Sequence, residues 1–129
     1  MFEVSIVSDV IDEIAPDTSE IRLLSKMKGG SVCHCTLPVG RTSIPVKHRR
    51  IEEIWYILGG EGEIWRSNQI MEMITAISSG MSLTIPPETS FQFRSTGTEP
   101  LTILIVTMPP WPGPEEAVQV NGIWPQNIR

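Results

Sequence analysis

The apolar runs of this chain are short, rich in β-branched residues and separated by Gly and Pro. The 129 residues include 17 Ile and 9 Val but only 7 Leu and 3 Ala, with 10 Gly and 11 Pro. Branching at Cβ stiffens a side chain and suits the pleated surface of a sheet, whereas Gly and Pro favour turns. The sequence therefore predicts an all-β protein and argues against a helical bundle or a coiled coil.

The pattern of apolar and polar residues predicts about eight to ten short strands. The clearest candidates cover residues 2–7, 20–25, 31–37, 54–58, 63–66, 70–77, 82–85, 91–95 and 101–108. Residues 54–58 are continuously apolar, which predicts a strand buried on both faces, and residues 101–108 give the strongest signal of a buried strand. Many short strands favour a sandwich or a closed barrel, because closure removes unpaired strand edges.

The length suits a single domain, since a domain typically takes about 100–200 residues. We expect residues 1–129 to form an N-terminal arm over residues 1–19, a barrel over about residues 20–108 and a tail over residues 109–129. The tail is rich in Pro and Trp and has few backbone donors, so it should lie over the barrel surface rather than join its centre.

The net charge of −5 and the pI of about 5.0 argue against nucleic acid as a partner. The one basic run, at residues 47–50, is followed after one residue by Glu52 and Glu53 and is expected to be a solvated strand end. No apolar run reaches the length of about 18 residues that a membrane-spanning helix needs, and the N-terminus does not resemble a signal peptide. These features predict a cytoplasmic protein with no membrane partner.

The two cysteines, Cys33 and Cys35, are separated by one residue. In a strand they share a face and His34 points the other way, and a disulfide at this spacing would be strained. We therefore expect buried, reduced thiols inside the fold and His34 on its outside.

Two segments resemble the motifs of the cupin superfamily. Residues 40–62 read GRTSIPVKHRRIEEIWYILGGEG, which is similar to the first motif, where a His-x-His pair precedes a Glu and then a Gly. Residues 80–97 read GMSLTIPPETSFQFRSTG, which resembles the second motif, where Gly and Pro precede a Gly, a His and an Asn. The short spacer between them is similar to that of small single-domain cupins. The resemblance implies a jelly-roll β-barrel, in agreement with the strand pattern.

The resemblance also implies a metal site of three His and one Glu inside the barrel. Such a donor set suits Fe, Mn, Ni, Cu or Zn. Its positions fall on Val46, His48, Glu53 and Phe91, so apolar side chains replace two of the four ligands. We therefore expect a mostly lost metal site and no cofactor; if a divalent transition metal binds at all, its ligands are His48 and Glu53. The Gly and the Asn of the second motif fall on Glu88 and Ser95.

Other residues offer alternative ligands. Cys33 and Cys35 would supply soft donors near His48, although the C-x-x-C spacing typical of zinc sites is absent. Glu52 neighbours the acidic position but faces the opposite side of a strand. Gln92 would face inward only if the register slipped by one residue, which would expose the aromatic residues beside it.

Seven side chains are expected to line an aromatic, apolar cup near the barrel mouth. They are Val46, His48, Glu53, Trp55, Ile57, Phe91 and Phe93. An apolar lining with a few placed polar groups is typical of a small-molecule site, and His48 and Glu53 would orient the ligand. The alternatives are a core filled by its own side chains and a simple ion pair at a strand end.

The leading hypothesis is thus a small-molecule-binding cupin whose ligand the sequence does not name. The sequence does not decide whether the chain is an enzyme. A metal-dependent dioxygenase or isomerase is one alternative, and a metal-free isomerase or cyclase that uses His48 and Glu53 as an acid–base pair is another. A structural interaction module is a third. The Trp residues of the tail, at 111 and 124, suggest an interface, and the resemblance also implies a homodimer.

Overall fold

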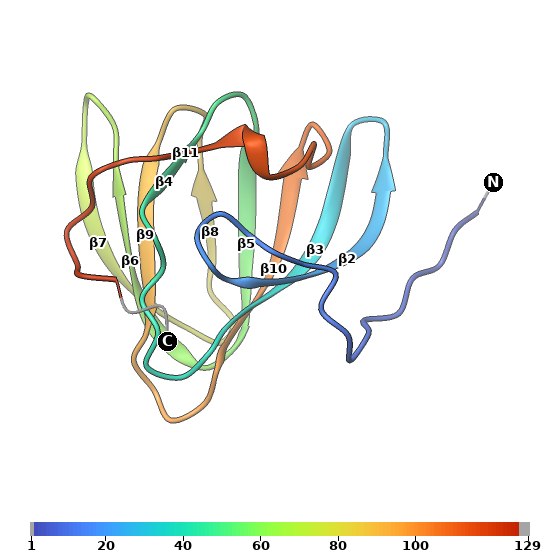
Figure 1. Ribbon diagram of the computed structural model, residues 1–129, viewed down its shortest axis with the longest axis horizontal. Helices are drawn as coiled ribbons and strands as arrows, with labels where there is room; N and C mark the ends of the chain where they lie inside the picture. The colour runs from blue at the N-terminus through green and yellow to red at the C-terminus, as the bar shows by residue number, and fades with distance from the viewer. Residues whose placement is uncertain (1, 127–129) are drawn as a thin grey trace.

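The computed structural model describes residues 2–126, which form two antiparallel β-sheets around a shared apolar core (Figure 1). The larger sheet has the strand order β1 (Glu13–Ile14), β2 (Glu20–Met27), β3 (Gly30–Leu37), β10 (Leu101–Met108), β5 (Glu52–Gly59) and β8 (Ser82–Ile85). The smaller sheet has the order β11 (Ala117–Gln119), β4 (Val46–His48), β9 (Ser90–Ser95), β6 (Glu61–Ser67) and β7 (Glu72–Ser78). The all-β jelly-roll prediction is confirmed. Within residues 2–126, no helix is long and apolar enough to cross a membrane.

The core lies where side chains from both sheets meet. Trp55, Phe91 and Phe93 are almost fully buried there, and the Trp55 ring lies edge-on to both Phe rings at centroid distances of 5.8 and 5.0 Å. Such edge-to-face contacts add to the stabilisation that area burial gives. These three aromatic rings form the centre of the core between the two sheets.

The prediction that residues 54–58 are buried on both faces is wrong. In β5, Glu53, Trp55 and Ile57 point into the core, whereas Ile54, Tyr56 and Leu58 on the other face are 41%, 46% and 41% exposed. β5 lies between β10 and β8 within one sheet, and no second layer of the described chain covers its outer face. The continuous apolar run of residues 54–58 therefore arises because the exposed outer face of β5 is apolar, not because both faces are buried.

The predicted strand over residues 2–7 is also wrong. Residues 2–7 are assigned no regular structure, and the chain enters the sheet only at β1. Phe2, Val4 and Ile6 are exposed. Alternating apolar residues favour a strand only when a neighbouring strand is available to pair, and this segment has none within the described chain.

The described part of the tail, residues 109–126, adds a strand to the edge of the smaller sheet. A short 3₁₀ helix, η1 (Pro114–Glu116), precedes β11, which pairs with β4 at the sheet edge. The Glu116 carboxylate accepts hydrogen bonds from the backbone N–H groups of Arg50 and Ile51. The tail thereby closes one side of the barrel mouth.

Beyond β11 the tail crosses the outer face of the smaller sheet, where Gln92 holds it (Figure 1). The Gln92 Nε2 group donates to the backbone oxygens of Ser43 and Trp124, and its Oε1 atom accepts from the N–H groups of Ile123 and Trp124. All four hydrogen bonds lie between 2.8 and 3.0 Å, and the Gln92 side chain is fully buried beneath the tail. Gln92 therefore acts as a clamp for the tail, a role that its outward position on β9 did not predict.

We expect Gln92→Leu to release the tail. The nearly isosteric side chain leaves the backbone groups of residues 123 and 124 without partners, which costs about 1–3 kcal/mol of unfolding free energy. Urea denaturation would measure that loss, and hydrogen exchange would show faster exchange over residues 120–124. Gln69→Leu is the control, because Gln69 is exposed on a loop. An unchanged tail in the Gln92 variant would contradict the clamp.

Candidate functional site

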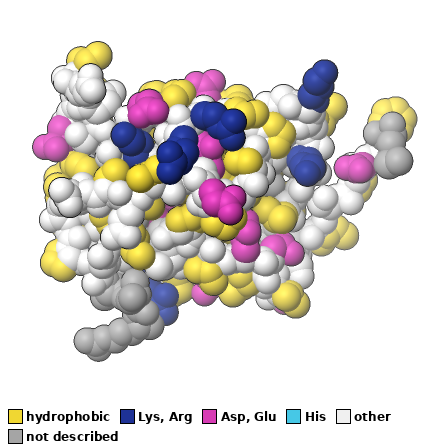
Figure 2. Space-filling view, turned by 45° about the horizontal axis from the view of Figure 1, so that its top comes forward, with side chains coloured by type: hydrophobic (Ala, Val, Ile, Leu, Met, Phe, Trp, Pro, Cys, Tyr) yellow, Lys and Arg dark blue, Asp and Glu magenta, His cyan; other side chains and the backbone are white. Residues whose placement is uncertain are grey.

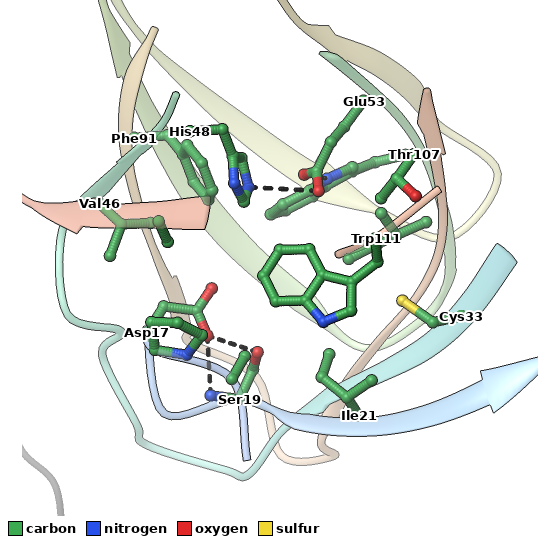
Figure 3. A pocket seen from close by; sticks show the side chains of 15 residues that line it. Asp17, Ser19, Ile21, Cys33, Val46, His48, Glu53, Phe91, Thr107 and Trp111 are labelled. Atoms are coloured by element: carbon green, nitrogen blue, oxygen red, sulfur yellow. Dashed lines mark hydrogen bonds and ion pairs between the residues drawn. The ribbon is translucent and has the colours of Figure 1, made fainter. Parts of the chain in front are cut away.

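A small cavity lies at the mouth of the barrel, beneath the turn between β1 and β2 and beside the tail (Figure 3). The strands supply the inward side chains of Val46, His48, Glu53, Trp55 and Phe91. The turn adds Asp17 and Ser19, and the tail adds Trp111. The cavity encloses about 40 Å³, whereas a single water needs about 10–15 Å³, so it has room for a few ordered waters.

His48 and Glu53 form a hydrogen-bonded pair in one wall of the cavity. The His48 Nε2 atom lies 3.3 Å from Glu53 Oε2, and the Trp55 Nε1–H donates to Glu53 Oε1 at 2.9 Å. His48 and Glu53 are only 6% and 5% exposed. One carboxylate thus fixes both the imidazole and the indole, which holds them in a single arrangement.

The pKa of His48 is raised above its ordinary value of 6.5. Burial alone lowers the pKa of this imidazole, but the hydrogen bond and the negative charge of Glu53 outweigh it, with smaller contributions from Asp17 and Glu116. The other ring nitrogen, Nδ1, is buried and has no hydrogen-bond partner among the described residues. A buried imidazole with a raised pKa and one unsatisfied nitrogen is suited to proton transfer or to orienting a polar ligand.

Asp17 brings a second carboxyl group to the cavity from the opposite wall. The turn that carries it is fixed by hydrogen bonds from Thr18 N to Ala15 O and from Ala15 N to Ser19 O. Asp17 Oδ1 accepts from both the backbone N–H and the hydroxyl of Ser19, and Figure 3 shows its other oxygen pointing into the cavity. Burial raises the pKa of Asp17, the two hydrogen bonds from Ser19 partly offset this, and the nearby charge of Glu53 raises it further.

Trp111 covers the cavity from the tail side. Its indole lies edge-on to the His48 ring, with the centroids 5.7 Å apart and an interplanar angle of 86°. The Trp111 Nε1–H donates to Glu13 Oε1 at 2.8 Å, and its backbone N–H donates to Ser31 Oγ at 3.0 Å. The His48 ring is therefore held between Trp111 and the Phe91 ring, whose centroid lies 5.5 Å away.

Five of the seven predicted cup residues line this cavity: Val46, His48, Glu53, Trp55 and Phe91. Ile57 and Phe93 are inward-facing but belong to the core below it, where both are fully buried. Asp17, Ser19 and Trp111 were not among the predicted residues. Polar turn residues and an aromatic tail are visible in the sequence, but nothing in their spacing shows which part of the barrel they cover.

The donor set does not fit the metal site that the resemblance implies. Val46 and Phe91, at two of the four ligand positions, present only carbon to the cavity, and His48 and Glu53 bond to each other. Across residues 2–126, no three His, Cys, Asp and Glu side chains are grouped closely enough to hold a metal ion. The alternatives do not repair the set: Glu52 is exposed, Gln92 faces the tail, and His34 faces away from the cavity on β3.

Both cysteines are free thiols on the inner face of β3; Cys35 is buried as predicted, whereas Cys33 is only half-buried. Cys33 lines the cavity and Cys35 is fully buried behind it. Burial, with the nearby charges of Glu53, Asp17 and Glu13, raises the pKa of Cys33 to about 12. A thiol that stays protonated is a weak nucleophile and a weak metal ligand, so Cys33 contributes apolar surface to the site.

Comparison with known proteins places these features in a family. The Cupin domain profile matches residues 33–107. The chain is 33% identical over 120 residues to uncharacterized protein MJ1618 of Methanocaldococcus jannaschii, and the match covers 86% of this chain and 93% of that protein.

Two solved structures share the fold. BH2720 from Bacillus halodurans is 20% identical, with a TM-score of 0.64 over 78% of this chain and 74% of that chain. Streptomyces PAC13 with uridine is 11% identical, with a TM-score of 0.71 over 96% and 94% of the two chains. Pac13 is described as a nucleoside dehydratase. The barrel, the two motifs and the profile match agree, and the chain belongs to the cupin domain family.

Proposed function

We infer that this cupin binds a compact small molecule in the cavity at the barrel mouth, without the family's metal. The inference depends chiefly on how the polar groups are placed. The His48–Glu53 pair and Asp17 face an otherwise apolar and aromatic space from opposite walls. A few convergent polar groups in an apolar lining are typical of a ligand site, and a core without a ligand role rarely buries three titratable side chains around one cavity.

The expected ligand has a flat or compact apolar body and at least one hydrogen-bonding group. The aromatic walls of Trp55, Phe91 and Trp111 suit the body, and the unsatisfied Nδ1 of His48 suits the polar group. With about 40 Å³ of free space, a ring compound enters only when Trp111 moves aside. A hydrogen bond to Glu13 holds the Trp111 indole and one to Ser31 holds its backbone N–H, so moving the ring aside breaks at least the bond to Glu13.

Fragment soaking of crystals tests the inference. The library should contain compact ring compounds and uridine, which a protein of the same fold binds. We expect density in the cavity bounded by His48 and Trp111, and solution affinity at least about 10-fold weaker in His48→Ala, since one buried hydrogen bond to a titrating group is lost. His34→Ala is the matched control because His34 lies on the outer sheet face. A cavity that accepts no fragment, or binding that His48→Ala leaves unchanged, would contradict the inference.

A metal-free acid–base enzyme is the second candidate, and one observation favours it. His48 combines a raised pKa with an unpartnered Nδ1, while Glu53 holds the opposite nitrogen. In that role His48 would hold or release a proton at Nδ1 and Glu53 would orient the ring and stabilise its charged form. Turnover of a bound compound that is lost in both His48→Ala and Glu53→Gln would separate this candidate from binding alone.

A further inference from the structure

Arg66 places a half-buried guanidinium between the two sheets. On β6 it is the register partner of Phe91 on β9 and of Met73 on β7, and cross-strand partners share a face, so its side chain lies on the inner side of the smaller sheet. The side chain reaches β8 in the larger sheet, where its Nη1 group donates to the backbone oxygen of Thr84 at 2.9 Å. Because β7 and β8 are the last strands of their sheets, Arg66 bridges two sheet edges.

The positive charge of Arg66 has no acidic partner within residues 2–126. Its Nη2 group contacts only neutral acceptors, Thr75 Oγ1 at 3.2 Å and Met73 Sδ at 3.7 Å. Burial lowers the pKa of Arg66, and no neighbouring carboxylate opposes that shift. Four other basic side chains lie 4.0 Å or less from a carboxylate: Arg22, Lys47, Arg50 and Arg94. A partly buried cation without a counter-ion favours an anion taken up from solution.

Arg66 lines a hollow of about 160 Å³ beside the loop that joins β6 to β7, called here the Arg66 hollow. It shares no lining residue with the cavity at the barrel mouth. The other described residues that line it are uncharged, and Met71, Met73 and Pro86 give it an apolar side. An apolar cavity of about 150 Å³ holds benzene in another protein, so the Arg66 hollow has room for a compact ring or a short branched chain.

Thr89 supplies a second polar group to the lining of the Arg66 hollow. The residue is only 4% exposed, and its Oγ1 atom has no hydrogen-bond partner among the described residues. Buried hydroxyls are normally hydrogen-bonded, so this one suits a ligand oxygen as its acceptor. The adjoining loop is already held in place, because Asn68 Oδ1 accepts from the backbone N–H groups of Ile70 and Met71. A site with fixed walls loses less conformational freedom when it binds a ligand.

The surface charge of the protein makes this local cation decisive for an anion. The chain has a net charge of −5, and the face shown in Figure 2 has basic and acidic side chains intermixed rather than a basic patch. A wider hollow of about 530 Å³, which shares Ser67 and Asn68 with the Arg66 hollow, contains Lys47. The Lys47 Nζ atom is 3.4 Å from Glu88 Oε2, so its charge is already partnered.

We propose that the Arg66 hollow binds a small monocarboxylate with a compact apolar body, at a site separate from the cavity at the barrel mouth. The carboxylate pairs with the guanidinium, whose five N–H groups outnumber its three contacts with β7 and β8. The apolar body lies against Met71, Met73 and Pro86, and the Thr89 hydroxyl donates to a carboxylate oxygen. One cation balances one negative charge, which favours a monocarboxylate over a doubly charged phosphate.

NMR titration of the full ¹⁵N-labelled chain tests this proposal, with benzoate as the probe and benzamide as its neutral isostere. We expect saturable benzoate-induced shifts centred on residues 66–73 and 84–89, with a Kd of about 1 mM or tighter for a ligand of this size. Benzamide and inorganic phosphate should each bind at least about 10-fold more weakly, because benzamide lacks the charge and phosphate lacks the apolar body.

Met73→Glu is the most informative variant, because it gives Arg66 a carboxylate partner inside the hollow and keeps the hydrogen bonds from Arg66 to Thr84 and Thr75. It should weaken benzoate binding at least about 10-fold, while urea denaturation shows parental or greater stability. Arg66→Gln should weaken binding as much, but it also removes those hydrogen bonds. Met27→Glu is the matched control, because Met27 is 81% exposed at the end of β2 in the other sheet. It should keep the parental affinity.

Four results would each overturn the proposal. They are the absence of saturable benzoate shifts, equal binding of benzamide, tighter binding of phosphate, and parental benzoate affinity in a folded Met73→Glu variant. Benzoate shifts centred on the Trp111 indole would also overturn it, because they would place the ligand in the cavity at the barrel mouth. That last result would leave the proposed function of the mouth cavity intact, so the two inferences fail separately.

Discussion

The double variant Val46→His with Phe91→His is expected to bind Ni²⁺ stoichiometrically, whereas the parent chain binds it weakly or not at all. Val46 and Phe91 are register partners on β4 and β9, and both line the cavity with His48 and Glu53. The His48 and Phe91 rings already lie 5.5 Å apart, so an imidazole at position 91 would converge with His48 and Glu53. Three His and one Glu are a donor set that divalent transition metals favour.

The gain in Ni²⁺ affinity should be at least about 100-fold. Even residues that only hydrogen-bond to the metal ligands typically contribute about 10–100-fold to metal affinity, and direct ligands contribute more. Titration calorimetry measures the affinity, and elemental analysis measures the metal content per chain. Adding His48→Ala to the double variant is the control, and it should remove most of the gain. Phe91 is a core residue, so the fold of each variant needs to be checked by circular dichroism. A folded double variant with parental Ni²⁺ affinity would show that these positions do not converge as ligands.

Glu53→Leu is expected to lower the unfolding free energy by about 2–6 kcal/mol. The Glu53 carboxylate accepts hydrogen bonds from two buried groups, the Trp55 Nε1–H and the His48 ring. Each buried donor left without an acceptor costs about 1–3 kcal/mol, and leucine fills a similar volume without accepting either bond. Urea denaturation measures the loss. Glu52→Leu is the control, because Glu52 is exposed on the other face of the same strand, where a substitution changes stability by about 0.5 kcal/mol or less.

The size of that loss should depend on pH. The folded pKa of His48 is raised above the unfolded value of 6.5, so its contribution to stability is fully present below pH 6.5 and disappears as pH rises through the folded pKa. Glu53→Leu removes the main cause of the raised pKa and leaves the burial that lowers it, opposed only by the smaller contributions of Asp17 and Glu116. The difference in stability between parent and variant should therefore be largest below pH 6.5 and shrink as the pH rises through the raised pKa of His48. A difference independent of pH would show that the two side chains are not coupled.

The sequence predicted the strands well where burial and local turns act together. The predicted strands over residues 82–85 and 101–108 coincide with β8 and β10, because each is bounded by Pro or Gly and carries one inward-facing apolar set. The inward direction of the His48, Glu53 and Phe91 side chains was also predicted, because successive side chains along a strand alternate between its two faces. The second motif's Gly position holds Glu88, whose φ of 63° keeps the left-handed backbone that glycine normally supplies.

The errors in strand prediction have one physical cause. Residues 54–58 and 2–7 are apolar in the sequence, but neither is buried on both faces by the described chain. The hydrophobicity of a segment shows that its burial would be favourable, but it does not show which other part of the structure buries it. Composition alone therefore does not distinguish an apolar segment that the chain buries from one that it leaves exposed.

The sequence by itself determined the fold class, the family and the loss of two metal ligands, because these depend on local periodicity and on residue identity at motif positions. Tertiary structure alone decided how the cavity is closed. Trp111 and Glu13 are 98 residues apart yet share a hydrogen bond across the barrel mouth, and Asp17 reaches the cavity only because its turn folds over it. Contacts between such distant segments depend on the path of the whole chain, and no spacing within either segment encodes them.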